Sequence, residues 1–123
     1  MPDRLVPRKP DVTFDRFDDI DMRVARVLSA PMTEGTRAPS RFLTLDAGPL
    51  GQVVSVGQYA LVDESDLVGR NVIACVNLGR RNIGKYVSEA LVLGVPNPTS
   101  PDGQAQALPL FVDDAARPGD RVF

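Results

Sequence analysis

The sequence predicts an all-β domain with small α content: a closed or nearly closed barrel of five short strands, one short helix between strands 3 and 4, and extensions at both termini. Its apolar runs are short, rich in Val, Ile and Leu, and bounded by Gly, Pro or polar residues, as strands are. A single acid-rich segment among them begins like a helix. The 123 residues, 43% of them hydrophobic, suffice for one core and are too few for two ordinary domains.

The predicted strands follow one another closely along the chain. Residues 20–28 alternate apolar and polar side chains until Ala25–Arg26, where a bulge or strong bend is expected. Residues 41–46 and 52–56 flank a glycine-containing turn and are expected to form a hairpin. The five predicted strands are residues 20–28, 41–46, 52–56, 71–76 and 90–93.

The segments between and beyond the strands carry helix and turn signals. Thr13 is expected to cap a helical turn that begins at Phe14. Asp63–Asp66 is expected to begin the short helix, which Gly69 ends. Residues 1–12 combine three prolines with charges, which predicts an extended or mobile arm, with a partner-binding arm as the alternative. The other predictions are loops at 31–39 and 95–107, a possible edge strand at 108–112 and a type II turn at Pro118–Gly119.

One short helix between the third and fourth of five strands is the element order of the OB-fold. In that fold the ligand surface lies across strands 2 and 3 and the loops after strands 1 and 4, which here are residues 31–39 and 79–87. A β-sandwich is the competing architecture, but the single helix within the strand order weighs against it.

Positive charge is concentrated between the last two predicted strands. Arg80, Arg81 and Lys85 lie in a stretch, Leu67 to Ser88, that contains no acid, although the formal net charge of the chain is −2. Such segregated charge favours a polyanion, and binding should be weak and salt-sensitive because the chain as a whole is acidic. The alternative is a charged loop that only keeps the surface soluble.

The composition excludes several classes of function. The chain has no histidine, which removes the commonest general base and zinc ligand. Its one cysteine, Cys75, lies in an apolar run and is expected to be buried and unreactive. Asp18, Asp19 and Asp21 lack the loop pattern of a calcium site, so we expect no metal or other cofactor. Neither a secretory signal nor a membrane-spanning run occurs, so the cytoplasm is the expected compartment.

The residues around the basic segment allow two interpretations each. Asn77 could bond local backbone or a ligand. Phe42 and Tyr86 could be rim aromatics on which a base or a peptide side chain stacks, although Phe42 could instead belong to the core. Glu89 is expected to be a structural partner of Arg81 or an acceptor for turn amides rather than a catalyst.

A spaced motif in the same region carries a family resemblance. It consists of Asn77-Leu78, Arg81, Ile83, Ser88-Glu89 and Leu91-Val92-Leu93-Gly94. With it the chain resembles the stand-alone tRNA-binding-domain proteins, and within that OB-fold family the bacterial CsaA-like export chaperones. Supporting matches are Phe17-Asp18, Met22-Arg23-Val24, Arg37-x-Pro39, Leu67-x-Gly69 and Pro118-Gly119.

The resemblance implies a non-catalytic OB-fold homodimer from residue 13 onward, whose terminal additions, including about 108–123, build the dimer interface. It implies tRNA as ligand, with unfolded or exported polypeptides as the alternative. Phe42 motivates that alternative, because relatives carry a lysine at its position. The RNA-binding candidates are Arg41, Asn77, Arg80, Arg81, Lys85 and Ser88.

Overall fold

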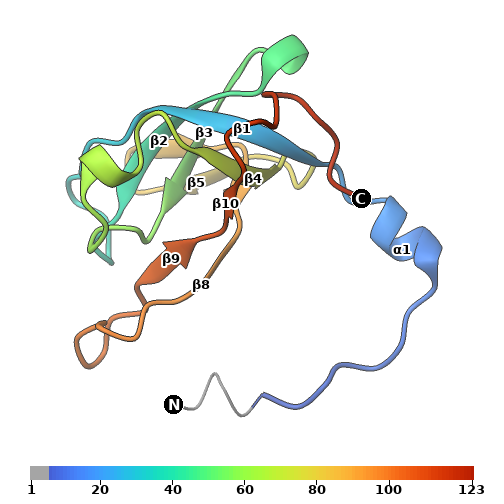
Figure 1. The fold of residues 1–123 in the computed structure, drawn as a ribbon. Helices are drawn as coiled ribbons and strands as arrows, with labels where there is room; N and C mark the ends of the chain where they lie inside the picture. The colour runs from blue at the N-terminus through green and yellow to red at the C-terminus, as the bar shows by residue number, and fades with distance from the viewer. Residues whose placement is uncertain (1–5) are drawn as a thin grey trace.

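The structure is a computed structural model that describes residues 6–123, and it is mostly β with one short helix (Figure 1). Residues 1–5 of the predicted arm lie outside the described part; residues 6–12 are exposed and contain no helix or strand. The elements are α1 (Phe14–Asp18), β1 (Met22–Ser29), β2 (Arg41–Asp46), β3 (Gln52–Gly57), β4 (Asn71–Cys75), β5 (Arg81–Ile83), β6 (Tyr86–Ser88), β7 (Leu91–Val92), β8 (Gly94–Pro96), β9 (Ala107–Pro109) and β10 (Phe111–Val112), with 3₁₀ turns η2 (Gly48–Leu50) and η3 (Glu64–Asp66).

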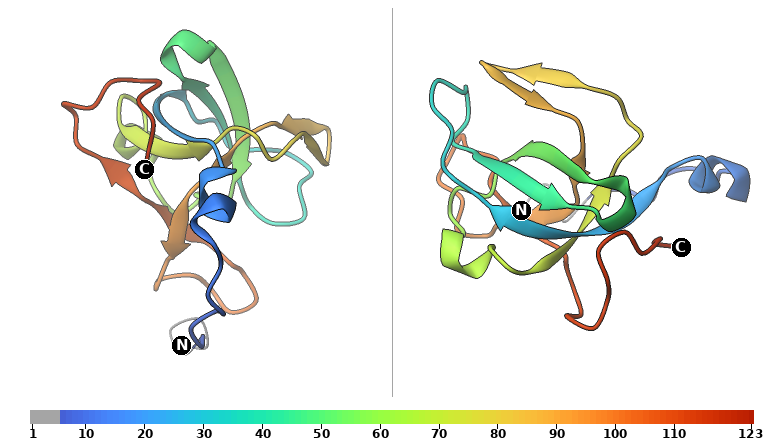
Figure 2. Two further views of the ribbon diagram at one scale, coloured as in Figure 1. Left: turned by 90° about the vertical axis from the view of Figure 1, so that its right-hand side faces the viewer. Right: turned by 90° about the horizontal axis from the view of Figure 1, so that it is seen from above.

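Six antiparallel strands form the main sheet. Its order is β10-β4-β1-β2-β3, and β7 also pairs with β4. Two separate ribbons, β5–β6 and β8–β9, extend from it (Figure 2). The all-β class is therefore confirmed, whereas the strand pairing among residues 6–123 does not close into the predicted five-stranded barrel.

Side chains replace a strand ladder at the open edge of β3. The Val54 N–H donates to Glu89 Oε1 (3.1 Å), and the Val56 N–H donates to Ser88 Oγ (3.0 Å). In return, the N–H groups of Glu89 and Ala90 donate to the Val54 carbonyl at 2.9 and 3.1 Å. The chain after β6 is thus attached to β3 without regular pairing, which is why the sheet stays open here.

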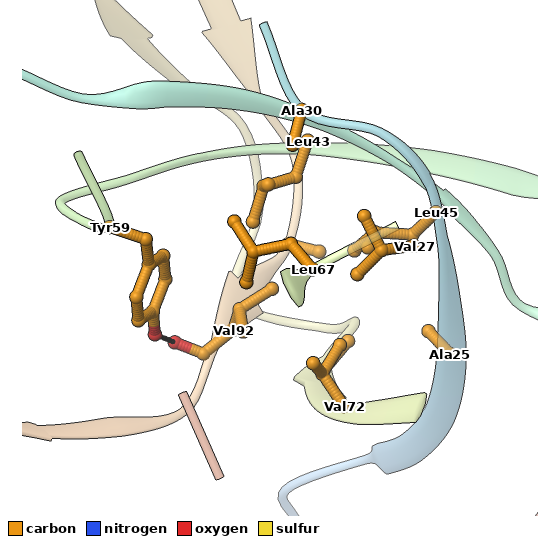
Figure 3. Packing of buried hydrophobic residues seen from close by; sticks show 11 residues of the cluster. Ala25, Val27, Ala30, Leu43, Leu45, Tyr59, Leu67, Val72 and Val92 are labelled. Carbon is orange, nitrogen blue, oxygen red and sulfur yellow. Dashed lines mark hydrogen bonds between the residues drawn. The ribbon is translucent and has the colours of Figure 1, made fainter. Parts of the chain in front are cut away.

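The core lies on the inner face of the main sheet (Figure 3). Leu43 and Leu45 alternate along β2 with half-buried residues, as the period of a strand requires. Tyr59 closes one end of the core and donates its hydroxyl to the Val92 carbonyl at 2.8 Å. Gly94 leaves room for that ring, because a Cβ at this position would lie 2.7 Å from Tyr59 Oη.

The C-terminal segment is part of this sheet. β2 pairs only with the second half of β1, from Arg26 onward. Residues 119–122 occupy the free edge of the first half: Gly119 and Val122 donate to the carbonyls of Val24 and Met22, at 2.7 and 2.9 Å. Consecutive strand residues point to opposite faces, so the burial of both Val24 and Ala25 indicates that both faces of β1 are covered.

Several local predictions need correction. The helical turn after Thr13 exists, but the Thr13 side chain makes no capping bond. The register shift in β1 falls between Val27 and Ser29, not at Ala25–Arg26. The expected loop at 79–87 contains the β5–β6 hairpin, and the loop at 95–107 forms the middle of a β8–β9 hairpin. The short helix between β3 and β4 is the 3₁₀ turn η3.

Within residues 6–123, no helix has the length and apolar character to cross a membrane. The same part of the chain contains no cluster of three or more His, Cys, Asp or Glu side chains suited to a metal ion.

Candidate nucleic-acid interface

The basic residues are presented by the β5–β6 hairpin, which stands out from the main sheet (Figure 2). Its strands pair from Arg81↔Ser88 to Ile83↔Tyr86, which leaves Gly84 and Lys85 as a two-residue turn. Gly84 has φ +58°, and a glycine at the first central position is what a type II′ hairpin turn requires. The hairpin therefore lifts its cations away from the core.

The three predicted cations are exposed. Arg80 Nη2 lies 3.5 Å from Glu89 Oε2, and Lys85 Nζ lies 3.5 Å from Glu34 Oε2. Arg81 makes no ion pair within residues 6–123. Long, exposed pairs of this kind contribute little to stability, so Arg80 and Lys85 can exchange their partners for a ligand anion, and Arg81 has no ion pair within residues 6–123 to exchange.

The hairpin is braced against the loop that follows β1. The Glu34 N–H donates to Tyr86 Oη at 3.0 Å. Phe42 and Tyr86 are both half-buried, and their ring centroids lie 5.4 Å apart. Phe42 is thus only partly buried, and its ring packs against that of Tyr86 in β6. These contacts bring together the two loops that the sequence assigned to the ligand surface.

Arg41 does not belong to this surface. Only 9% of the residue is exposed, and its guanidinium donates to three backbone carbonyls. Nε bonds the carbonyls of Tyr59 (3.1 Å) and Val62 (3.0 Å), and Nη1 bonds that of Ala30 (2.7 Å). These bonds neutralise the cost of burying the charge, and they leave Arg41 with a structural role instead of the predicted phosphate contact.

Two polar candidates are also occupied by backbone. Asn77 accepts from the Asp21 N–H and donates to the Asp19 carbonyl, both at 2.8 Å. Ser88 is buried, and its Oγ accepts from Val56 and donates to the Ala90 carbonyl (3.3 Å). Both side chains therefore have structural roles, and the backbone that Asn77 bonds is distant in sequence rather than local. RNA contact by these two residues stays a prediction.

Glu89 has the predicted structural role with different partners. It bonds the Val54 N–H in β3 rather than an amide of the turn, and it pairs with Arg80 rather than Arg81. Cys75 is buried as expected. Burial, and secondarily the negative charge of Asp21, raises the pKa of its thiol, so it is a poor nucleophile.

A groove of about 450 Å³ beside the hairpin contains a residue that the sequence analysis did not name as an RNA contact. Arg37, in the loop after β1, is exposed and lines the groove together with Arg81 of β5. Val56, Ile83 and Leu91 are among the apolar residues between them. Arg37 lies in one of the two loops of the expected ligand surface, and this position in the sequence could have indicated it as a ligand contact.

Comparison with known proteins identifies relatives over most of the chain. No protein-family model matches it. It is 37% identical over 122 residues to a methionine–tRNA ligase of Thiobacillus denitrificans, a match that covers 94% of this chain and 17% of the ligase. A methionine–tRNA ligase of Sorangium cellulosum is 32% identical over 116 residues, covering 94% and 16%. The chain thus spans about a sixth of the length of the curated relatives it matches.

Solved structures give the same fold over whole chains. The CsaA chaperone protein of Picrophilus torridus has a TM-score of 0.78 at 25% identity, covering 92% of this chain and 100% of its own. Chaperone CsaA of Bacillus anthracis has a TM-score of 0.77 at 27% identity, covering 93% and 100%. A MetRS-related protein of Pyrococcus horikoshii matches in fold, with a TM-score of 0.79 at 20% identity. The chain is therefore similar in sequence to a segment of methionine–tRNA ligases and in structure to CsaA proteins.

Proposed function

We propose that this chain is a non-catalytic, OB-type tRNA-binding protein whose β5–β6 hairpin contacts backbone phosphates. The observation that carries the proposal is the set of three exposed cations, Arg80, Arg81 and Lys85, on a braced hairpin inside an acid-free stretch. The sequence relatives are ligases named for tRNA, which supports tRNA as the polyanion. A cytoplasmic location remains the prediction made from the sequence.

Phosphate binding follows from the geometry of the hairpin. A guanidinium can donate two parallel hydrogen bonds to a phosphate, whereas the ammonium of Lys85 acts as a point charge. The brace through Tyr86 fixes the direction in which these side chains leave the surface. Because the net charge is −2, attraction is local, and affinity should fall steeply as salt rises.

The chemistry of the site supports a binding role rather than catalysis. Ser88 Oγ is bonded only to backbone groups, so no base activates it. The chain supplies no histidine for proton transfer.

We propose a homodimer formed at the opposite end of the molecule. There α1 and the C-terminus lie near each other (Figure 1). They border a groove of about 560 Å³ that Phe14, Phe17 and Phe123 line together with charged residues, namely Asp18, Asp21, Arg23 and Arg121. Phe14 is 74% and Phe123 93% exposed, which is unusual for aromatics unless a partner covers them. Light scattering at micromolar protein should give twice 13.3 kDa, and Phe14→Ser with Phe123→Ser should give 13.3 kDa with an unchanged fold. A wild-type protein that is monomeric would contradict the dimer.

Polypeptide holding is the second candidate. Phe42 and Tyr86, which is part of the basic hairpin, form a half-buried aromatic pair. Two of the similar solved structures are named CsaA chaperones. If polypeptides are the ligand, Phe42→Ser with Tyr86→Ser should weaken suppression of client aggregation, and charge reversal of the hairpin should not. Folded aromatic variants that hold clients as well as wild type would reject this candidate.

The test of the RNA proposal is tRNA binding measured by fluorescence anisotropy at several salt concentrations. Arg81→Glu with Lys85→Glu should abolish binding, because the phosphate contacts of both side chains are lost. Where residual binding can be measured, each lost contact should reduce the steepness of log affinity against log salt by roughly 0.7–0.9. Arg16→Glu with Arg117→Glu makes the same charge change on exposed residues outside the hairpin and is the matched control. Equal affinity and slope in the hairpin variant would reject the site.

A further inference from the structure

The groove beside the hairpin is adjacent to a second hollow, and the two share a wall. The first has a volume of about 450 Å³ and extends from the loop after β1 to β9. The second has a volume of about 190 Å³ and is bounded by Leu78, Gly79, Ser88 and Ala90. Arg81 and Leu91 line both hollows, so these two side chains form the ridge between them.

Each hollow has room for a planar ring. A closed apolar cavity of about 150 Å³ accommodates benzene, and both volumes exceed that. Apolar side chains line much of both surfaces, including Ile83 and Val92 in the larger hollow and Leu78 in the smaller. In the larger hollow the exposed side-chain amide of Gln58 makes no hydrogen bond within residues 6–123, so it offers a donor and an acceptor to the edge of a ring.

The charges are placed at the ridge and at one side of the larger hollow. Among residues 6–123, no carboxylate lines either hollow. Arg81 lies between the two hollows, and Arg37 lines the larger one from a different element. Neither arginine has an ion-pair partner among residues 6–123. A ligand that fills both hollows therefore meets a cation at the point where its two apolar groups are linked.

We propose that the two hollows hold two consecutive bases of an unpaired RNA strand, with the phosphate between them bound by Arg81 and an adjoining phosphate by Arg37. This inference rests on the proposed function and specifies which part of the RNA the protein reads. In RNA every link between successive bases carries a charge, whereas successive side chains of a peptide are linked by a neutral amide. The cation on the ridge therefore favours RNA over an extended peptide.

Fluorescence anisotropy with two labelled probes tests the proposal: a 12-nucleotide RNA without self-complementarity and the duplex of the same length. Wild type should bind the single strand more tightly, although the duplex carries twice the charge. Leu91→Thr should weaken single-strand binding by about fivefold, because the bases lose an apolar contact. The salt slope should be unchanged, because no phosphate contact is lost. Leu91→Ile should retain binding. Leu61→Thr, at a similarly exposed leucine that lines neither hollow, is the matched control.

Arg37→Gln separates the phosphate contact from the ring contacts. Its single-strand salt slope should fall by roughly 0.7, whereas Arg117→Gln, an exposed arginine away from both hollows, should leave the slope unchanged. Thermal melting followed by circular dichroism establishes that each variant is folded.

The outcomes distinguish this inference from the proposed function. If wild type binds both probes with a steep salt dependence, prefers the duplex and is unaffected by Leu91→Thr, phosphate binding stands and the two-base site is wrong. If Leu91→Thr weakens binding of an apolar peptide but not of RNA, the hollows belong to polypeptide and the inference is also wrong. If wild type binds tRNA at low salt but neither of these probes, the two-base site is wrong and the proposed function stands. If it binds no tRNA, the proposed function falls and this inference with it.

Discussion

The β2–β3 and β5–β6 hairpins are both antiparallel pairs with short turns, but they contribute different things. β2–β3 pairs six residues from each strand, and alternate side chains of β2 are buried. β5–β6 pairs three residues from each strand, and of these six only Ser88 is buried. A hairpin whose residues are not needed in the core can expose charged side chains on both of its faces. It must then be anchored from outside, which here is done by Tyr86, Ser88 and Glu89.

The largest difference should appear when each hairpin loses an apolar side chain. Leu43→Ala in β2 should lower the free energy of unfolding by about 2–5 kcal/mol, because it removes a fully buried side chain and leaves a cavity. Val87→Ala in β6 should cost less than about 1 kcal/mol, because Val87 is exposed. Chemical denaturation measures both. Equal losses would mean that β5–β6 also supports the core.

Alkaline pH should weaken the core through the buried hydroxyl of Tyr59. Burial raises the pKa of Tyr59 to about 12, above the ordinary value of 10.0. The folded state therefore holds this proton more tightly than the unfolded state, so the contribution to stability is complete below pH 10 and is lost as pH rises to about 12. The loss should be on the order of 2–3 kcal/mol. Tyr59→Phe should remove this part of the pH dependence in denaturation measured from pH 9 to 12; an identical profile would contradict the assignment.

The two arginines Arg41 and Arg81 should separate stability from binding. Arg41→Met should lower the free energy of unfolding by about 2 kcal/mol, because it removes the bonds to three carbonyls. Of these, the Tyr59 carbonyl keeps its bond from the Val62 N–H. In the temperature range where the variant is folded, its affinity for RNA should be unchanged. Arg81→Met should do the reverse, with little change in stability and weaker RNA binding. Denaturation and anisotropy on both variants provide the comparison, and a loss of RNA affinity in folded Arg41→Met would return Arg41 to the site.

The smallest expected effect concerns the anchor of the hairpin. Ser88→Ala removes the acceptor for the Val56 N–H and should cost about 1 kcal/mol. The Val56 amide should then exchange its hydrogen faster, whereas amides paired between β1 and β4 should be unaffected. Hydrogen exchange followed by NMR resolves these positions. Unchanged exchange at Val56 would show that the edge of β3 does not depend on Ser88.

Much of the fold could be predicted from the sequence because strand periodicity is local. The β2–β3 hairpin lies where the alternation and the turn residues placed it, and the extra pairing at Gly57 lengthens β3 by one residue. β5 and β6 were assigned to a loop, since three-residue strands are too short to show a period. The sequence also predicts a closed barrel, yet the edge of β3 is bonded by the side chains of Ser88 and Glu89 instead of a further strand. Hydrophobic periodicity does not indicate such side-chain bonds.

The sequence by itself determined that this chain is mostly β, that its positive charge is segregated between residues 67 and 88, and that histidine chemistry is absent. These properties depend on composition and on neighbours along the chain. Only the tertiary structure decided that Arg41 is buried while Arg81 lies between two hollows. The reason is physical: a guanidinium can be buried only where hydrogen-bond acceptors converge on it, and here these are backbone carbonyls. The three that bond Arg41 come from Ala30, Tyr59 and Val62, which the folded chain alone brings together.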